Sequence, residues 1–255
     1  MDVHGRYIVS CQNQGIASIY RLCGKRFRLE GQFHLATFHK HNHANVASFG
    51  LEKAQKADPL PVIYVSQCSK HPIDGRKDVL YAERIEPGFK GSSLVQTIFY
   101  DDVDHDFGYA LQWVIDQQEG MLYGYGNTIN NSDPENRHRV IKFRLPALSE
   151  GPLVVLKRED ALEDYLIEEV SSFSFNPIGQ GLFIHKGKLY MPTGVGKPDK
   201  PSILYIWDLQ NRSMEVIDLS TVTTGELEDI SYWGKYFYIQ SQDGLFRLKL
   251  GEAAK

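Results

Sequence analysis

The sequence is poor in cysteine. Its only thiols are Cys11, Cys23 and Cys68, an odd number with no CxxC spacing, which argues against a disulfide framework and a cysteine-based metal site. Cys11 and Cys23 fall on neighbouring predicted strands, so a pairing between them is the alternative. We expect three free, buried thiols that behave as small hydrophobic side chains.

A surplus of positive charge and long apolar runs are also missing. The 28 Lys and Arg residues against 32 Asp and Glu residues give a net charge of −4, so the basic surface that general nucleic-acid binding requires is not expected. No apolar run approaches the roughly 20 residues of a membrane-spanning helix. No charged segment followed by an apolar stretch marks a signal peptide at the N-terminus.

Helical patterns are rare, whereas aromatic residues are plentiful. The chain contains 14 Tyr and 13 Phe residues, which favour pleated strands. The best helical candidate is the short acidic segment Glu159–Ile167, which we place in a connection between strands. Because Pro and Gly are spread evenly and no linker is visible, we expect one all-β domain over 1–250, followed by a disordered tail over 251–255.

One cassette recurs along the chain. A short apolar stretch is followed by a turn containing Gly, a second apolar stretch rich in Tyr, a variable loop and a third strand. The glycine provides the positive φ of a hairpin turn. Clear copies begin at Asp2, Leu182 and Ile230, and looser copies begin at Val46 and Leu111. A fourth, outer strand is predicted at Phe27–Leu35, Leu94–Tyr100, Val154–Leu156 and Met214–Leu219.

This repeat predicts a β-propeller of about five blades, each with three to four antiparallel strands. Units of roughly 45–65 residues fill the chain and are close to known blade lengths. A β-sandwich also alternates strands and turns, but it does not reuse one cassette. The cassette resembles the blades of the NHL, YVTN and glutaminyl-cyclase groups of propellers, in which the motif present here as Gly187-Lys-Leu-Tyr190 follows the innermost strand. Propellers of this appearance are often exported, so the resemblance implies a periplasmic or extracellular location, with any signal peptide absent from this chain.

Binding residues are expected where the innermost strands begin, because these strand ends surround one mouth of the central channel. Alignment of the repeats places Asn45, Tyr109, Gln180 and Glu228 at these starts, with His43, Asp106 and Glu226 just upstream. The groups are far apart in the sequence but could converge on one ligand. The alternative is a polar, water-filled rim that binds nothing.

Two local clusters indicate a divalent metal, Ca²⁺ or another ion. The histidines of His39-Lys-His41-Asn-His43, with His34 nearby, alternate and would share one face if the segment were a strand. The acidic segment Asp101–Asp106 has spacing suited to oxygen ligands, but it lacks the central Gly and closing Glu of an EF-hand loop. A polar histidine loop and a solvated acidic loop are the alternatives.

The segment Glu226-Leu-Glu228-Asp229 resembles the acidic start of a blade in glutaminyl-cyclase-type propellers. Propeller lactonases hold Ca²⁺ with carboxylates and Asn side chains, and this resemblance implies Asn45 and Glu228 as ligands. Five-bladed glycosidases use three carboxylates on successive innermost strands. Asn45, Tyr109 and Gln180 occupy those positions here and are not acidic, which counts against a glycosidase.

Two functions follow from these observations. The first is a binding module that holds a small molecule, a glycan or a protein partner at the channel mouth, because the scaffold lacks a complete catalytic set. Its recognition loops would be Gly50–Leu60, His71–Asp78 and Thr128–His138. The second is a metal-dependent hydrolase of lactonase or phosphoesterase type. Its metal ligands would be His43, Asn45, Asp106 and Glu228.

Overall fold

The fold is nearly all β. The computed structural model describes residues 1–250 except 25, 70, 131–132, 134 and 168–178, and excludes the side chains of residues 109 and 110. The tail predicted over 251–255 therefore lies outside the described residues. Within the described part there is no helix long and apolar enough to cross a membrane.

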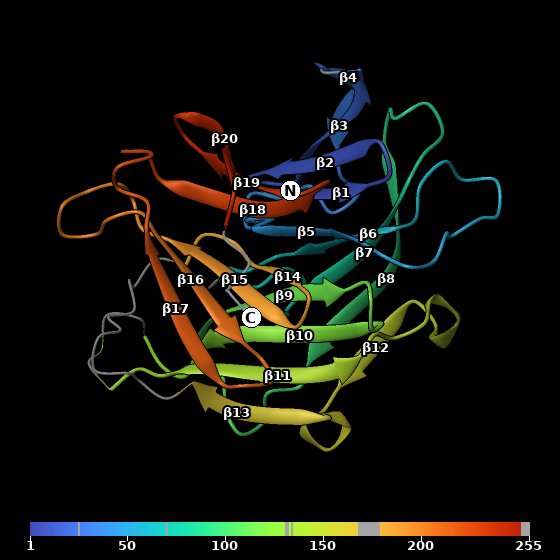
Figure 1. Ribbon diagram of the computed structural model, residues 1–255. Helices are drawn as coiled ribbons and strands as arrows, with labels where there is room; N and C mark the ends of the chain where they lie inside the picture. The colour runs from blue at the N-terminus through green and yellow to red at the C-terminus, as the bar shows by residue number, and fades with distance from the viewer. Residues whose placement is uncertain (25, 70, 131–132, 134, 168–178, 251–255) are drawn as a thin grey trace.

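Five sheets follow one another along the chain, each built on the repeated cassette (Figure 1). Blade 1 contains β1 (Asp2–His4), β2 (Tyr7–Gln12), β3 (Ile16–Cys23) and β4 (Arg26–His34). Blade 2 contains β5 (Val46–Phe49), β6 (Ile63–Ser66), β7 (Leu80–Ile85) and β8 (Ser92–Tyr100), with β12 (Leu153–Leu156) outside β8. Blade 3 contains β9 (Tyr109–Asp116), β10 (Met121–Asn127), β11 (His138–Arg144) and β13 (Glu163–Ile167). Blade 4 contains β14 (Phe183–His185), β15 (Lys188–Thr193), β16 (Ile203–Asp208) and β17 (Ser213–Asp218), and blade 5 contains β18 (Leu227–Trp233), β19 (Tyr236–Ser241) and β20 (Gly244–Leu248).

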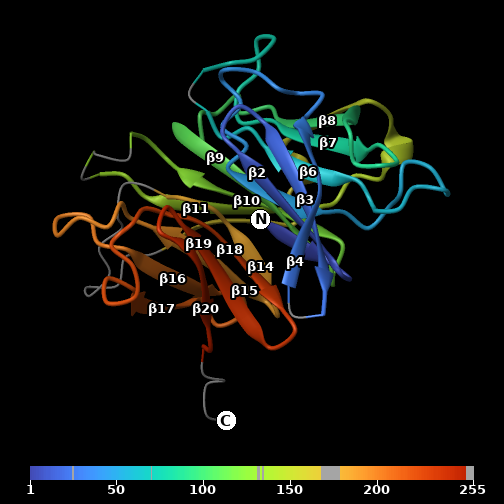
Figure 2. The ribbon, with the colours of Figure 1, turned by 90° about the horizontal axis from the view of Figure 1, so that it is seen from above.

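The innermost strands close a ring. Strand β1 contacts β5, β5 contacts β9, β9 contacts β14, β14 contacts β18, and β18 contacts β1. Figures 1 and 2 show the sheets arranged around a common axis, with the first blade (blue) beside the last (red). The chain is therefore a five-bladed β-propeller, and the prediction from the repeat is confirmed.

Hydrophobic clusters fill the spaces between neighbouring blades. Leu122, Trp113 and Phe143 pack with side chains of blade 2 and are almost fully buried. Three further clusters lie between blades 3 and 4, blades 1 and 2, and blades 4 and 5. Side chains alternate along each strand, so both faces of a blade contribute to a cluster. This alternation explains why inner strands such as β6 and β16 are apolar on both faces, whereas the outer strands β4 and β17 are polar and largely exposed.

Two expectations about blade 3 were wrong. Glu159–Ile167 is not a helix: a single 3₁₀ turn, Arg158–Asp160, precedes the outer strand β13. Cross-strand ion pairs from Asp164 to Arg139 (2.6 Å) and from Glu163 to Lys142 (3.3 Å) hold β13 on β11, and this tertiary pairing overrides the local helical pattern. The segment Val154–Leu156 is a strand, β12, but it pairs in parallel with β8 of blade 2 instead of extending blade 3.

The cysteines are all free, but they are not all buried. Cys23 is exposed, and Cys11 and Cys68 are partly buried. Cys11 faces Ala17 in the ladder between β2 and β3, whereas Cys23 lies at the far end of β3 beside Arg26. The alternative of a Cys11–Cys23 disulfide is excluded, because the two thiols sit at opposite ends of the sheet.

We predict that Leu122→Ala destabilises the propeller far more than the matched change Leu166→Ala. Leu122 is fully buried between blades 2 and 3, whereas Leu166 on β13 is 45% exposed. Removing the buried side chain should lower the free energy of unfolding by about 2–5 kcal/mol, and the exposed one by about 0.5 kcal/mol or less. Urea unfolding measures both, and equal losses would contradict this packing.

We also predict that backbone amides of β20 exchange with solvent much faster than those of β10. Strand β20 is the outer strand of a three-stranded sheet and is largely exposed, while β10 is a central strand in a buried ladder. Edge strands open locally at lower free energy than central ones. Hydrogen–deuterium exchange with mass spectrometry tests this, and equal protection of the two strands would refute it.

Candidate functional site

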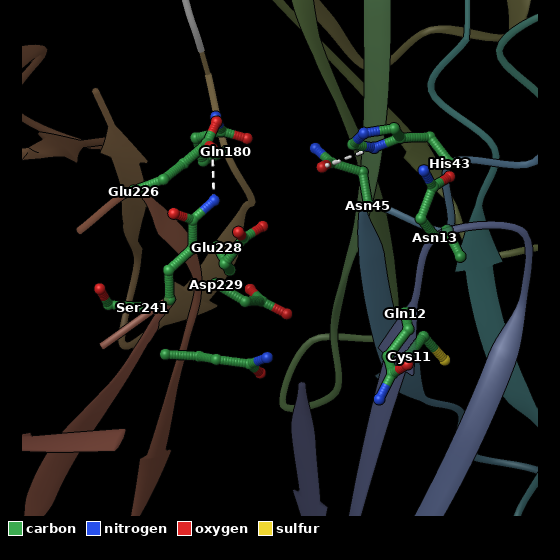
Figure 3. A pocket seen from close by; sticks show the side chains of 13 residues that line it. Cys11, Gln12, Asn13, His43, Asn45, Gln180, Glu226, Glu228, Asp229 and Ser241 are labelled. Atoms are coloured by element: carbon green, nitrogen blue, oxygen red, sulfur yellow. Dashed lines mark hydrogen bonds between the residues drawn. The ribbon is translucent and has the colours of Figure 1, made fainter. Parts of the chain in front are cut away.

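A polar pocket of about 430 Å³ lies where innermost strands β5 and β18 begin. Side chains from blades 1 and 5 and from the segments leading into blades 2 and 4 line it. Its polar lining includes Gln12, Asn13, His43, Asn45, Gln180, Glu226, Glu228 and Asp229. Figure 3 shows two walls, with Gln180 and the three acidic residues facing the side chains of blades 1 and 2. The volume of the pocket is in the range of small-ligand sites.

The wall of blades 1 and 2 is fixed by two buried polar side chains. Asn42, fully buried, donates from Nδ2 to the carbonyl of Thr37 (3.0 Å) and accepts from the amide of Ala44 (3.0 Å). Glu83 of β7 is also fully buried and accepts from the amides of Ala36 (2.9 Å) and Thr37 (3.1 Å). These bonds satisfy the backbone of the connecting loop. They set the direction in which the chain enters β5, and therefore where His43 and Asn45 point.

His43 and Asn45 interact directly at this wall. Nδ1 of His43 lies 3.1 Å from Oδ1 of Asn45 (Figure 3). The side-chain nitrogen Nδ2 of Asn45 is buried and has no hydrogen-bond partner among the described residues. The wall therefore offers hydrogen-bonding groups from an imidazole and an amide and contains no carboxylate.

Turns of blade 5 fix the opposite wall. The hydroxyl of Thr223 accepts from the amide of Gly225 (3.0 Å) and donates to Asp243 (2.8 Å), which shapes the chain just before Glu226. The carboxylate of Glu226 then accepts from Nε2 of Gln180 and from Nε2 of Gln242 (2.8 Å). Two amide donors from different blades thus hold Glu226 in one orientation.

The electrostatics of this wall are dominated by carboxylates. Partial burial, and then the nearby charge of Glu226, raise the pKa of Glu228 above its ordinary value, while a hydrogen bond from Gln242 opposes the shift. Asp229 is buried and is paired with the amino group of Met1. Removal of the Cys11 thiol from water raises its pKa to about 12, so it is protonated and unsuited to act as a nucleophile.

The structure brings together most of the predicted site residues, but not all of them. Asn45, Gln180, Glu226, Glu228 and His43 all line the pocket. Tyr109 is the first residue of β9, as the repeat alignment expected, but its side chain lies outside the described part. The lining residues that sequence reasoning missed include Gln12, Asn13, Gln240 and Gln242, which lie in or beside hairpin turns. The alignment considered only the innermost strands and so gave no signal for them.

Asp106 does not line the pocket. Its carboxylate pairs with Arg139 (3.0 Å) and with Arg158 (3.5 Å), and it accepts from the hydroxyl of Tyr100 (3.1 Å). Asp102 of the same segment accepts from the amides of residues 106 and 107, at 2.6 and 3.0 Å. The acidic segment is thus neutralised by arginines and backbone amides, an arrangement that leaves its oxygens engaged.

The histidines also separate. His39 and His41 have ring centroids 5.3 Å apart, and His41 lies 4.6 Å from His71, while His34 stacks on Phe38. His43 instead points to the pocket. Across the described part of the chain, no three His, Cys, Asp or Glu side chains form a group that could hold a metal ion.

The expected recognition loops do not share one face. Residue 46 at the start of β5 pairs with residue 66, and residue 66 pairs with residue 80, so the loop His71–Asp78 lies at the pocket end of blade 2. Thr128–His138 joins β10 to β11 in the same way. Gly50–Leu60 follows the far end of β5 and lies at the opposite face. Two of the three loops therefore lie on the same face of the propeller as the pocket, and the described residues of neither loop line it.

Comparison with known proteins finds no sequence family and several solved structures that are similar at low identity. The sequence matches no protein-family model, and no curated protein matches it. Sqt1 of Saccharomyces cerevisiae is similar at 9% identity with a TM-score of 0.43, over 96% of this chain and 56% of Sqt1, so this chain spans little more than half of that protein. A chain in a nidogen/laminin complex is similar at 10% identity with a TM-score of 0.47, over 96% of this chain and 90% of that one. The designed protein Ika8 is similar at 8% identity with a TM-score of 0.39, over 99% of this chain and 71% of Ika8. At this level the matches carry no information about function.

A buried acid in the loop between β6 and β7 gives a pH prediction. Burial raises the pKa of Asp78 to about 7, and its Oδ1 has no hydrogen-bond partner among the described residues. The folded state then holds this proton more tightly than the unfolded chain, so stability is lost as pH rises from about 4 through about 7. Above pH 7 the free energy of unfolding can be lower by up to about 4 kcal/mol for this reason.

We therefore predict that the free energy of unfolding of Asp78→Asn, compared with that of wild type, rises between pH 5 and pH 8. Urea unfolding of both proteins at the two pH values measures this difference. Asn tolerates the positive φ of 57° at this position. The exposed Asp199→Asn is the control and should show no pH-dependent gain. A pH-independent difference between Asp78→Asn and wild type would show that the carboxyl is not held protonated.

Proposed function

We propose that this propeller is a binding module whose ligand, a small molecule or a segment of a protein partner, occupies the polar pocket at the mouth of the channel. The observation that carries this proposal is the convergence of side chains from distant parts of the chain on one cavity of about 430 Å³. Their positions are fixed by buried hydrogen bonds, such as those of Asn42 and Glu83, before any ligand arrives. Preorganised groups lose little conformational entropy on binding.

A metal-dependent hydrolase has less support. Such an enzyme would need several ligands around one ion. Of the four residues expected to supply them, Asp106 is paired with arginines and does not line the pocket, and the described residues contain no group of three His, Cys, Asp or Glu side chains that could hold an ion. Binding is therefore the function we propose.

The test is a screen of wild-type protein by thermal shift against a library of amino acids, amines, sugars and nucleosides. We predict that compounds raising the melting temperature lose at least about tenfold in affinity in Asn45→Ala and Glu228→Gln, because each change removes a polar contact from the pocket. Lys56→Ala, in the exposed loop at the opposite face, is the matched control and should bind normally. Compounds that bind all variants equally would place the ligand elsewhere.

A further inference from the structure

The two walls of the pocket differ in charge. One carries the carboxylates of Glu226, Glu228 and Asp229, and the other carries His43 together with the uncharged side chains of Gln12, Asn13 and Asn45 (Figure 3). Asp229 is already paired with the amino group of Met1. The unneutralised negative charge of the cavity is therefore concentrated on Glu226 and Glu228.

These two carboxylates have no cationic partner. No Lys or Arg lies within ion-pair distance of either one among the described residues. Glu228 is half-buried beside the like charge of Glu226, and its raised pKa reflects this environment. Two neighbouring carboxylates of this kind gain most from a cation that donates hydrogen bonds to both.

The remaining lining narrows the kind of cation. No described residue that lines the pocket is Phe, Tyr or Trp, whereas cations without N–H groups, such as quaternary ammonium, are recognised by aromatic faces. No group of three His, Cys, Asp or Glu side chains that could hold a metal ion is assembled in the described part of the chain. Nδ2 of Asn45, on the facing wall, is a buried hydrogen-bond donor with no partner among the described residues. The ligand that meets these conditions has N–H donors on a positive group and a carbonyl or hydroxyl acceptor elsewhere.

We propose that the pocket binds an organic cation, an ammonium or guanidinium group seated on Glu226 and Glu228, whose neutral polar remainder contacts the wall of Gln12, Asn13 and Asn45. This inference rests on the proposed function and specifies the ligand class for that site. Glu226, held by Gln180 and Gln242, supplies a fixed acceptor, and Glu228 supplies the second acceptor.

The experiment compares four probes by isothermal titration calorimetry. Nα-acetylarginine amide carries one guanidinium and two carbonyls, and Nα-acetylcitrulline amide is its neutral isostere. Choline is a cation without N–H donors, and Ca²⁺ is the metal alternative. We expect the arginine probe to bind and the citrulline probe to bind at least about tenfold more weakly. Glu228→Gln should reduce arginine-probe affinity by about tenfold or more, while Glu215→Gln, exposed on β17, should not. Thermal melting checks that both variants are folded.

Several results would overturn the inference. Equal binding of the arginine and citrulline probes, or Glu228-dependent binding of choline or Ca²⁺ in preference to the arginine probe, would refute recognition of an N–H cation and leave the binding site itself intact. Recognition of an N–H cation is also refuted, and the binding site kept, if no probe binds but the library yields another ligand that requires Glu228. If no probe binds and no library compound requires Asn45 or Glu228, the inference and the proposed function both fail.

Discussion

The contact between the first and last blades closes the ring, and the rest of the structure depends on it. Blade 1 is made only of N-terminal strands and blade 5 only of C-terminal strands, so no strand is shared between them and no strand pairing fastens the ring. They are joined by side-chain contacts and by the pairing of the Met1 amino group with Asp229. Four hydrophobic clusters fill the other interfaces, but no comparable cluster spans blades 5 and 1 among the described residues. Phe27 instead meets Trp233 with ring centroids 5.9 Å apart, and the fully buried hydroxyl of Ser231 has no partner there.

Polar contacts near the axis also hold blade 1 in the ring. The carboxylate of Asp2 on β1 accepts from the amide of Phe49 (2.6 Å) and from Nε2 of Gln117 (2.8 Å), which ties blade 1 to blades 2 and 3. The hydroxyl of Ser10 donates to Gln240 (3.4 Å) across the junction with blade 5. The pocket lies over the same junction, because Gln12 and Asn13 belong to blade 1 and Glu228 to blade 5. A ligand that contacts both walls would therefore also stabilise the junction between blades 1 and 5.

The cassette predicted the blades well because it records local pairing. A strand, a glycine turn and a second strand specify an antiparallel hairpin within a few residues, and stacking of such units follows from their apolar faces. The errors arose where pairing was distant in the sequence. Val154–Leu156 pairs with β8 across more than 50 residues, and no local pattern distinguishes that partner from β11. In the same way, the ion pair of Asp164 with Arg139 decides the conformation of Glu163–Ile167 only after β11 is in place.

The site was predictable to the extent that it follows the repeat. Equivalent positions of the innermost strands led to Asn45, Gln180 and Glu228, because strand starts in a ring necessarily surround one opening. Asp106 could not be placed in this way, since its neutralisation depends on arginines that follow it by 33 and 52 residues. Glu83 shows the same limit more sharply: in the sequence it is one acid among many on a strand, yet in the fold its burial beneath the loop 36–37 fixes one wall of the pocket. A buried carboxylate with several donors is costly to misplace, so the geometry of the pocket depends on a side chain that a surface pattern would assign to solvent.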